Sequence, residues 1–390
     1  MKCFFLLLAV STIAPEDTTP LRFERIVIDD RFPGGYQVEI ADVDGDGKPD
    51  IIALGGSTCV WYQNSTWKKR IISTAKQTPG IISSATRDLD GDGKAEVAIA
   101  YEFTMTKPNE GKVLLARQGK SVDDAWSFEP IADLGSVHRL RWANLMDDQP
   151  QLVAAPIFGS NATPPAYDQQ GAQIRLFHPK LDGTRISFVT TTIAHEFPVL
   201  HAIEISKIGK TSEHMILTAS NQGIGKTVAD SKTWVTSQVS SGAKGENPKR
   251  GSSEIHLGQI KGKGDFYATI EPWHGNQVVV TKATESGPAE REILDDTLDD
   301  GHALWVVDID GDGTDEIFAG HRGKDARVSV YRYDGKAWLH TILDPDVAAQ
   351  DLRGGDLDGD RVPDVIAVGG KTQNIVWYRP ILREHSKLSP

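Results

Sequence analysis

Short apolar runs recur along nearly the whole chain and are separated by polar and glycine-rich turns. Some runs are wholly apolar, as at residues 51–54 and 97–100, and others alternate apolar with polar residues. Both patterns are typical of β-strands, because successive side chains of a strand point to opposite faces of a sheet. The pattern therefore predicts an all-β protein.

An acidic turn follows a predicted strand in four places. It reads Asp-x-Asp-Gly-Asp, and a fourth carboxylate stands eight residues after the first Asp. So many carboxylates repel one another unless a cation binds, and oxygen ligands at alternating positions suit Ca²⁺. The alternative is a solvated acidic hairpin turn. The predicted calcium ligands are Asp42, Asp44, Asp46 and Asp50; Asp88, Asp90, Asp92 and Glu96; Asp308, Asp310, Asp312 and Glu316; and Asp356, Asp358, Asp360 and Asp364.

These turns differ from an EF-hand loop in their second half. Residue twelve is alanine or isoleucine, where an EF-hand needs a bidentate glutamate. The flanking residues alternate like strands rather than repeating like helices. We therefore expect three to four Ca²⁺ ions, each in a turn between two strands. The fourth turn is expected to bind more weakly, because Arg361 replaces the glycine that a tight turn favours.

The acidic turns also mark an internal repeat. The first Asp stands at positions 42 and 88, then at 308 and 356, which gives spacings of 46 and 48 residues around a gap of 220. That gap has room for three further units with the same alternation of strand and turn. The degenerate units lie at residues 138–156, 201–220 and 252–271, with Asn144, Lys207 and Gln259 in place of the first Asp.

Seven units of about four strands each predict a β-propeller. The last unit lacks a fourth strand, and residues 23–30 resemble the missing one. Pairing the two would close the ring and remove an exposed sheet edge. We therefore predict a single seven-bladed propeller of four-stranded blades over residues 21–380, closed by the N-terminal strand, with residues 381–390 as a tail.

Composition limits the classes of partner and the location. The net charge of −12 disfavours binding to nucleic acid, and the chain has no apolar stretch of about 18 residues that would span a membrane. Residues 1–14 are typical of a short signal peptide, which predicts a secreted or periplasmic protein; the alternative is a buried apolar N-terminus. After cleavage Cys59 would be the sole cysteine, which excludes an internal disulfide. We expect a monomer.

The acidic turns and the apolar strands after them resemble FG-GAP/VCBS repeats, the calcium-binding propeller repeats of integrin-like and bacterial secreted proteins. A narrower resemblance covers residues 216–224, 269–280 and 301–323, which are similar to the propeller domain of aldos-2-ulose dehydratase and its bacterial relatives. That resemblance implies elimination of water from an oxidised sugar with the help of a metal ion. Enzymes of that family also carry cupin-like domains, so only the chemistry of the propeller is expected of these residues.

Several histidines share one position of the repeat. Six residues before the first Asp, or its replacement, stand His138, His201 and His302, three of the eleven histidines. Tyr36 and Gln350 take the same place in the first and last units. In a propeller this position faces away from the acidic turns, at one end of the central channel. Histidines that meet there can bind a metal or carry protons; the alternative is that they cap the backbone of a neighbouring blade.

This face suggests a carbon–oxygen lyase of the sugar dehydratase kind, with a second divalent metal beside the calcium ions. Two non-catalytic functions remain open: a module that binds a carbohydrate or an extracellular protein, and an adhesion or assembly component. The candidate catalytic residues, as metal ligands or as acid and base, are His138, His201, His302, Glu271 and His274. The candidate ligand-binding residues are Trp273, Tyr167, Asn221, His321 and Arg322.

Overall fold

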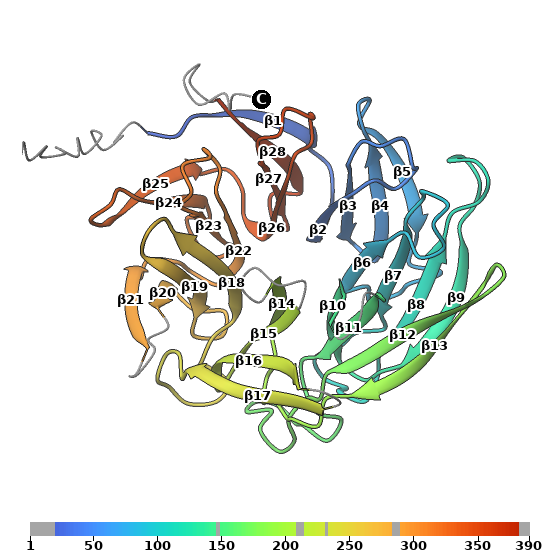
Figure 1. Ribbon diagram of the computed structural model, residues 1–390, viewed down its shortest axis with the longest axis horizontal. Coiled ribbons are helices and arrows are strands. Elements are labelled where there is room, and N and C mark those ends of the chain that lie inside the picture. Colours follow the sequence, from blue (N-terminus) through green and yellow to red (C-terminus); the bar gives the residue numbers. More distant parts are fainter. Residues whose placement is uncertain (1–19, 146–148, 208–213, 231–232, 283–288, 382–390) are drawn as a thin grey trace, which may run out of the picture.

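The computed structural model of the protein describes residues 20–145, 149–207, 214–230, 233–282 and 289–381. The predicted signal peptide and residues 382–390 lie outside the described residues. Seven four-stranded antiparallel sheets form a ring around one axis, with the first strand of each sheet innermost (Figure 1). The predicted seven-bladed all-β propeller is therefore confirmed.

The first four blades follow one another along the chain, and each begins with its innermost strand. Their strands are β2 (Gly35–Ala41), β3 (Asp50–Gly55), β4 (Thr58–Gln63) and β5 (Lys68–Ser73) in blade 1; β6 (Ser83–Arg87), β7 (Glu96–Tyr101), β8 (Lys112–Arg117) and β9 (Ser127–Asp133) in blade 2; β10 (Val137–Ala143), β11 (Gln151–Pro156), β12 (Arg175–Asp182) and β13 (Arg185–Thr192) in blade 3; and β14 (Ala202–Lys207), β15 (His214–Ser220), β16 (Gly223–Asp230) and β17 (Thr233–Ser240) in blade 4.

The last three blades repeat this order, but blade 7 takes its outer strand from the start of the chain. Their strands are β18 (Glu254–Ile260), β19 (Gly264–Glu271), β20 (Gln277–Lys282) and β21 (Glu290–Asp295) in blade 5; β22 (Gly301–Val307), β23 (Glu316–His321), β24 (Val328–Tyr333) and β25 (Trp338–Asp344) in blade 6; and β26 (Ala349–Gly355), β27 (Asp364–Gly369), β28 (Asn374–Pro380) and β1 (Phe23–Asp29) in blade 7.

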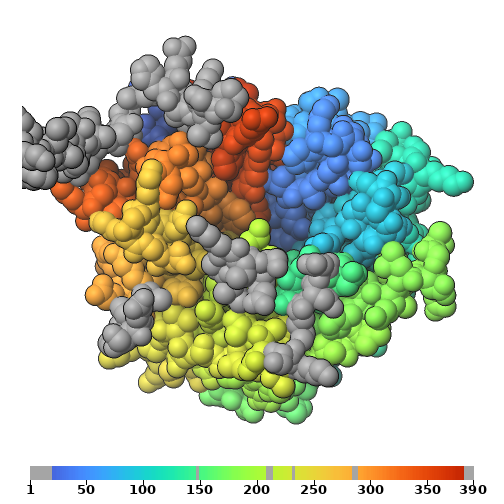
Figure 2. Space-filling model, in the orientation of Figure 1, coloured from blue at the N-terminus to red at the C-terminus, as the bar shows by residue number. Residues whose placement is uncertain are grey.

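The ring is closed by the predicted pairing of the two ends of the chain. Strand β1 runs antiparallel to β28, with Phe23 opposite Pro380 and Val27 opposite Val376. The blade built this way packs directly against blade 1, as the adjoining red and blue regions of Figure 2 show. An apolar cluster that includes Phe32, Val38 and Ile366 fills the contact between these two blades. No open sheet edge is left between blades 7 and 1.

Burial decreases from the second strand of a blade to the fourth. Strands β3, β11, β23 and β27 are buried at every residue, because neighbouring blades cover both of their faces. The outer strands expose most of their side chains, as in β21, where only the last residue is buried. The polar outer strands β13, β16 and β17 carry Thr, Ser and Lys in place of apolar residues, and the sequence pattern did not identify them.

Three tyrosine–aspartate hydrogen bonds join neighbouring blades at equivalent places. In each, a third-strand tyrosine donates its hydroxyl to an aspartate at the end of the preceding blade's outer strand. Both groups are largely withdrawn from water, which strengthens the tie. The pairs are Tyr62–Asp29 at 2.6 Å, Tyr331–Asp295 at 2.7 Å and Tyr378–Asp344 at 2.8 Å.

Candidate functional site

A β-bulge turns one residue of several inner strands toward the ring axis. The register between first and second strands shifts by one residue at Tyr36, His138, His302 and Gln350, the repeat position that the sequence analysis identified. A bulge leaves its extra residue outside the regular ladder and redirects the side chain. In blade 4 His201 stands just before β14, and its N–H donates to Ala219 O.

The Nδ1–H of each of these histidines donates to a backbone carbonyl at the same repeat position in the next blade. The acceptor can only accept, so Nδ1 carries the proton and Nε2 keeps its lone pair. The expected backbone caps are therefore present, and they leave the metal-binding nitrogen available. The hydrogen bonds are His138 to His201 O at 2.9 Å, His201 to Ser253 O at 3.0 Å and His302 to Gln350 O at 2.6 Å.

Three imidazoles meet at the axis. One ligand nitrogen each from His201, His274 and His302 lies within 4.8 Å of the others. His274 comes from the loop after β19, and its Nε2 is 2.9 Å from Nε2 of His201. Nε2 of His302 is buried and has no hydrogen-bond partner. Three imidazole nitrogens of this kind suit a zinc-like or other transition-metal ion.

The four histidines are held in the neutral form. Burial lowers the pKa of His138, His274 and His302 below its usual value, and nearby arginines lower it further. Burial also lowers the pKa of His201, although Glu254 opposes the shift. A neutral imidazole is the form that binds a metal or accepts a proton, so the electrostatics match the geometry.

Partly exposed polar side chains surround the buried imidazoles. Arg322 lies over His274, with Nη2 3.2 Å from Nδ1 of that ring. Its Nε donates to Asp300 Oδ2 at 2.8 Å, and its Nη1 donates to Gln350 Oε1 at 2.7 Å. Nδ1 of His274 is also 3.5 Å from Asp300 Oδ1. A guanidinium held in this way offers a fixed positive charge to an oxygen atom that approaches the cluster.

A tyrosine–histidine pair stands next to the three imidazoles. The Tyr36 hydroxyl donates to Nε2 of His138 at 3.0 Å, since Nδ1 of that ring already donates elsewhere. The ring of Tyr36 also contacts the ring of His302, with centroids 5.5 Å apart. Next to Tyr36 and His138, Arg139 and Glu254 form an ion pair with a separation of 3.0 Å. The pKa of Glu254 falls to about 2, because Arg139 and His201 outweigh the effect of burial.

Glu271 does not join the cluster. Its carboxylate pairs with Arg291 at 2.8 Å and accepts hydrogen bonds from Thr269 and Ser252. It is not among the groups within 4.8 Å of one another at the axis. Its predicted place in a loop on the same face as the histidines made it a candidate, but the strand directs the side chain into the blade.

The other candidate ligand-binding residues have mixed placements. Tyr167 stacks on Phe158 with centroids 4.0 Å apart, and Trp273 is only 7% exposed, so both fill a loop core rather than offering a face to a sugar. His321 is buried and bonded to Asp299 and Arg327. Asn221 donates to Asn247. Two of the five contact the histidine cluster: Arg322 through its guanidinium, and Trp273 through its ring, whose centroid lies 4.9 Å from that of His274.

Sequence reasoning missed Tyr36, Asp300 and Gln350 as site residues. Tyr36 and Gln350 carried a usable signal, because they share the repeat position of the histidines. Asp300 gave no such signal: it precedes the bulge of blade 6, and its contacts with Arg322 and His274 appear only in the folded ring.

At the other end of the inner strands, each acidic turn gathers its carboxylates within ligand distance. The groups that could hold a metal include Asp42, Asp44 and Asp50 in blade 1 and the corresponding triplets in blades 2 and 6; in blade 7 the group is Asp356, Asp358 and Asp360. In each turn the fourth carboxylate accepts the N–H of the residue after the first Asp, as Asp50 does from Val43 at 2.9 Å. Arg361 has a φ of 72°, close to the 82° of Gly47, so the fourth turn keeps the same shape.

The ionised form of each fourth carboxylate is unfavourable in the absence of a cation. Burial, with the neighbouring aspartates, raises the pKa of Asp50, Glu96 and Asp364 to about 7 and that of Glu316 to about 9. A divalent cation would relieve this cost by compensating the charge. The oxygen-rich set therefore fits Ca²⁺, as the donor chemistry of the turns predicts.

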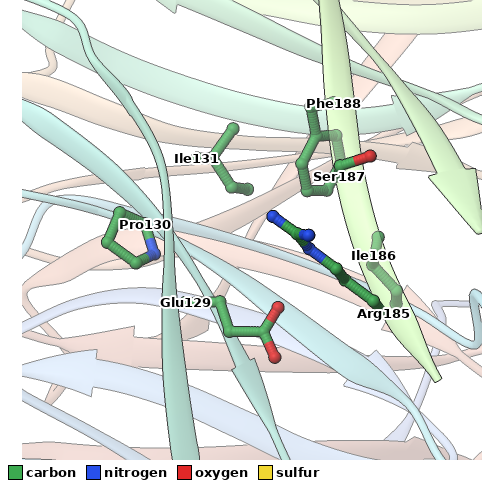
Figure 3. Close-up of a pocket in the computed structure, with 7 residues that line it drawn as sticks. All are labelled: Glu129, Pro130, Ile131, Arg185, Ile186, Ser187 and Phe188. Atoms are coloured by element: carbon green, nitrogen blue, oxygen red, sulfur yellow. The ribbon is translucent and has the colours of Figure 1, made fainter. Parts of the chain in front are cut away.

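A hollow on the rim of the ring lies apart from both ends. It is bordered by strands β9 and β13, where Pro130, Ile131, Ile186 and Phe188 form its apolar lining and Arg185 reaches across it (Figure 3). None of its lining residues belongs to the histidine cluster or to an acidic turn. We therefore place the candidate site at the axis.

Comparison with known proteins confirms both sequence resemblances. A family described as FG-GAP-like repeat matches residues 42–99 and 308–367, and one described as aldos-2-ulose dehydratase, β-propeller domain, matches residues 111–283. The curated aldos-2-ulose dehydratase of Phanerodontia chrysosporium is 26% identical over 358 residues, which cover 77% of this chain and 38% of that protein. The chain thus matches little more than a third of that relative's length.

Solved structures support the fold. A chain of a mitotic checkpoint complex has a TM-score of 0.55 at 12% identity, covering 96% of this chain and 99% of that one. An Agrocybe aegerita lectin that recognises non-reducing terminal N-acetylglucosamine has a TM-score of 0.50 at 14% identity, covering 81% of each. In the described part of the chain no helix is long and apolar enough to cross a membrane. The protein is a seven-bladed propeller with FG-GAP-like repeats, related to the propeller domain of aldos-2-ulose dehydratase.

Proposed function

We propose that this protein is an exported, calcium-binding propeller that eliminates water from an oxidised sugar at the histidine cluster. The observation that carries the proposal is the convergence of His201, His274 and His302 within 4.8 Å of one another. Imidazoles from three blades with free or shared Nε2 atoms are costly to bury without a ligand. The relationship to aldos-2-ulose dehydratase supports the reaction class.

The three imidazoles would hold a divalent metal ion. Such an ion would supply a positive charge for the oxygen of a carbonyl and for the enolate that forms when a neighbouring carbon loses its proton. The backbone carbonyls that accept from His201 and His302 fix the ring orientations and make these nitrogens better ligands.

The groups around the cluster would transfer protons and bind the substrate. Tyr36 and His138 form the proton carrier, since the hydroxyl shares its hydrogen with an unprotonated Nε2 at 3.0 Å. They would take the proton beside the carbonyl and return one to the departing hydroxyl. Arg322 would bind a carbonyl or carboxylate oxygen of the sugar. One C–H and one C–O bond break, a C=C bond forms and water leaves, so no oxidant is needed.

Calcium in the acidic turns would stiffen the end of the ring opposite the site. Three to four turns offer suitable oxygen ligands, and a calcium-rich extracellular or periplasmic compartment would keep weak sites occupied. In this proposal the calcium ions stabilise the ring and take no part in the reaction, because six residues of inner strand, about 20 Å, separate the two ends.

Metal analysis and a reaction screen test the proposal together. The purified protein should contain one transition-type ion beside calcium, and His201→Ala should lose that ion while the exposed His195→Ala keeps it. Mixing with oxidised sugars should produce new ultraviolet absorbance from the unsaturated product. Calcium alone, with no absorbance change, contradicts the proposal. Metal at the histidines without turnover would identify a carbohydrate-binding module instead.

A further inference from the structure

The residue at one repeat position of the third strand reaches into each acidic turn. It lies opposite the fourth carboxylate, one residue beyond the last pair of the ladder between the second and third strands. The four residues at this place are not alike. They are Gln63 in blade 1, Arg117 in blade 2, Arg332 in blade 6 and Arg379 in blade 7, which follow the pairs Ile51–Tyr62, Val97–Ala116, Ile317–Tyr331 and Val365–Tyr378.

In three blades this position puts a guanidinium on the predicted calcium ligands. Nη2 of Arg117 is 2.6 Å from Asp90 Oδ2, and its Nε is 3.5 Å from Glu96 Oε1. The other two arginines repeat the approach to the second Asp of their turns. Arg332 lies 3.1 Å from Asp310 and 3.9 Å from Glu316, and Arg379 lies 3.6 Å from Asp358.

In blade 1 the same place holds a neutral amide. Nε2 of Gln63 donates to Asp44 Oδ2 at 2.6 Å, and its Oε1 accepts from Arg70 at 3.1 Å. The amide of Gln63 therefore stands between the Arg70 guanidinium and the Asp44 carboxylate. Lys48 is 3.9 Å from Asp46, but its side chain is 55% exposed, so water screens its charge. The blade 1 turn therefore has four carboxylates, as many as each of the other turns, with less positive charge beside them.

We propose that this position sets the calcium affinity of each turn, so that the blade 1 turn binds Ca²⁺ most tightly. In blades 2 and 6 the well-buried arginines already neutralise part of the charge and repel an incoming cation. Arg379 is more exposed and acts more weakly. The inference rests on the proposed calcium binding of the acidic turns.

The arginines do not satisfy the turns completely. Glu316 is fully buried, and its Oε1 has no hydrogen-bond partner while it points into the same group as Asp308 and Asp310. A buried carboxylate oxygen without a partner is costly, so the turn of blade 6 retains the capacity for a cation. Replacing the arginine should therefore expose a second strong site, and we expect affinity changes on the order of 10- to 100-fold.

Calcium titration of the full chain by calorimetry, after removal of bound ions with a chelator, tests the assignment. The wild type should show one tight site followed by weaker ones. Gln63→Arg should remove the tight site, whereas Arg332→Gln and Arg117→Gln should each add one. Arg185→Gln, which removes the same charge on the outer strand of blade 3, should leave the titration unchanged.

The outcomes separate the two proposals. If the wild type binds several ions with equal affinity and none of the three variants changes the titration, this position does not set affinity, although calcium binding stands. If neither the wild type nor the two arginine variants bind Ca²⁺, the calcium proposal itself fails. Circular dichroism melting of every variant confirms that the ring is folded before titration, and the two arginine variants serve as independent replicates.

Discussion

The two ends of the ring axis gather potential metal ligands in opposite ways. At one end each set of carboxylates comes from a single hairpin turn, with all four groups of blade 1 between Asp42 and Asp50. At the other end His201, His274 and His302 come from blade 4, from the loop after β19 in blade 5 and from blade 6. The first kind of site needs only a local fold, whereas the second exists only when the ring is assembled.

The chemistry of the two ends differs as well. Each acidic turn offers only oxygen ligands, and burial raises the pKa of its fourth carboxylate, which suits a hard cation. Neutral imidazoles, with burial lowering their pKa, suit a softer ion that can polarise a substrate. In the proposed function, the length of the inner strands separates a structural task from a chemical one. Four predictions test this separation.

The largest expected effect follows from removing one imidazole. His302→Ala should reduce turnover of the sugar at least ~10³-fold, equivalent to about 4 kcal/mol of barrier, while calcium uptake stays normal. The converse variant Asp42→Asn should weaken calcium binding and leave turnover near that of the wild type. Rate assays and calcium titration on both proteins check this. Loss of both properties in either variant would mean that the ends are not independent.

Two tyrosines provide a matched pair with opposite expectations. Tyr36→Phe removes the proposed proton carrier and should lower turnover about 10²-fold with an unchanged melting temperature. Tyr331→Phe removes an interblade hydrogen bond to the buried Asp295 and should cost about 1–3 kcal/mol of stability with unchanged turnover. Kinetics and thermal melts of both variants measure the contrast. Equal effects on stability would argue against a chemical role for Tyr36.

Calcium removal should act on stability alone. Each occupied turn adds about 2.7 kcal/mol at an ion concentration 100 times its Kd. Since 1 kcal/mol corresponds to about 2–4 °C in a domain of 150–250 residues and to less in a larger one, each occupied turn should raise the melting temperature by about 5 °C. A calcium-selective chelator should therefore lower the melting temperature by several degrees. It should leave the metal content of the histidine cluster unchanged. Calorimetric melts with and without added calcium give the size of the effect. A melting temperature indifferent to calcium would contradict a structural role for the turns.

The smallest effect concerns acid stability of the blade contacts. Burial alone would raise the pKa of Asp295, but hydrogen bonds from Thr297 and Tyr331 outweigh it and hold the pKa below its usual value. Asp29 behaves alike, with the hydroxyl of Tyr62 as the first opposing bond. A lowered pKa contributes stability that is complete above the ordinary value near 3.8 and is lost as the pH falls through the folded value.

The melting temperature should therefore decline below about pH 4, and Asp295→Asn should make that decline less steep. Asp30→Asn, at an exposed residue beside Asp29, serves as the control and should leave the slope unchanged. A slope that neither variant alters would place the acid sensitivity elsewhere in the molecule.

The sequence predicted what is local and periodic. Four acidic turns of fixed spacing determined the blade number, and they also aligned His138, His201 and His302 at one repeat position. Tyr36 occupied that position too, yet its role depends on a hydrogen bond to a ring 102 residues away, which no pattern displays. Glu271 was a candidate because of its predicted place in a loop on the same face as the histidines, and its side chain turns instead to Arg291.

The missed strands have a similar cause. Strands β16 and β17 are rich in Thr, Ser and Lys, because the outer part of blade 4 faces water and has little apolar surface to bury. Period-two alternation weakens wherever one face of a strand has no partner. The residue that faces each acidic turn from the third strand could not be predicted either. Identifying it requires the register between the second and third strands.

The pairing of β1 with β28 sets an order in time. The first strand of the ring is synthesised long before its partner, so blade 7 cannot form until Asn374–Pro380 is available. Gln350, which accepts from His302 and from Arg322, belongs to that last blade. The histidine cluster is thus completed only after blade 7 has been synthesised. A chain that binds metal there before its ring is closed would have to do so without its full set of supports.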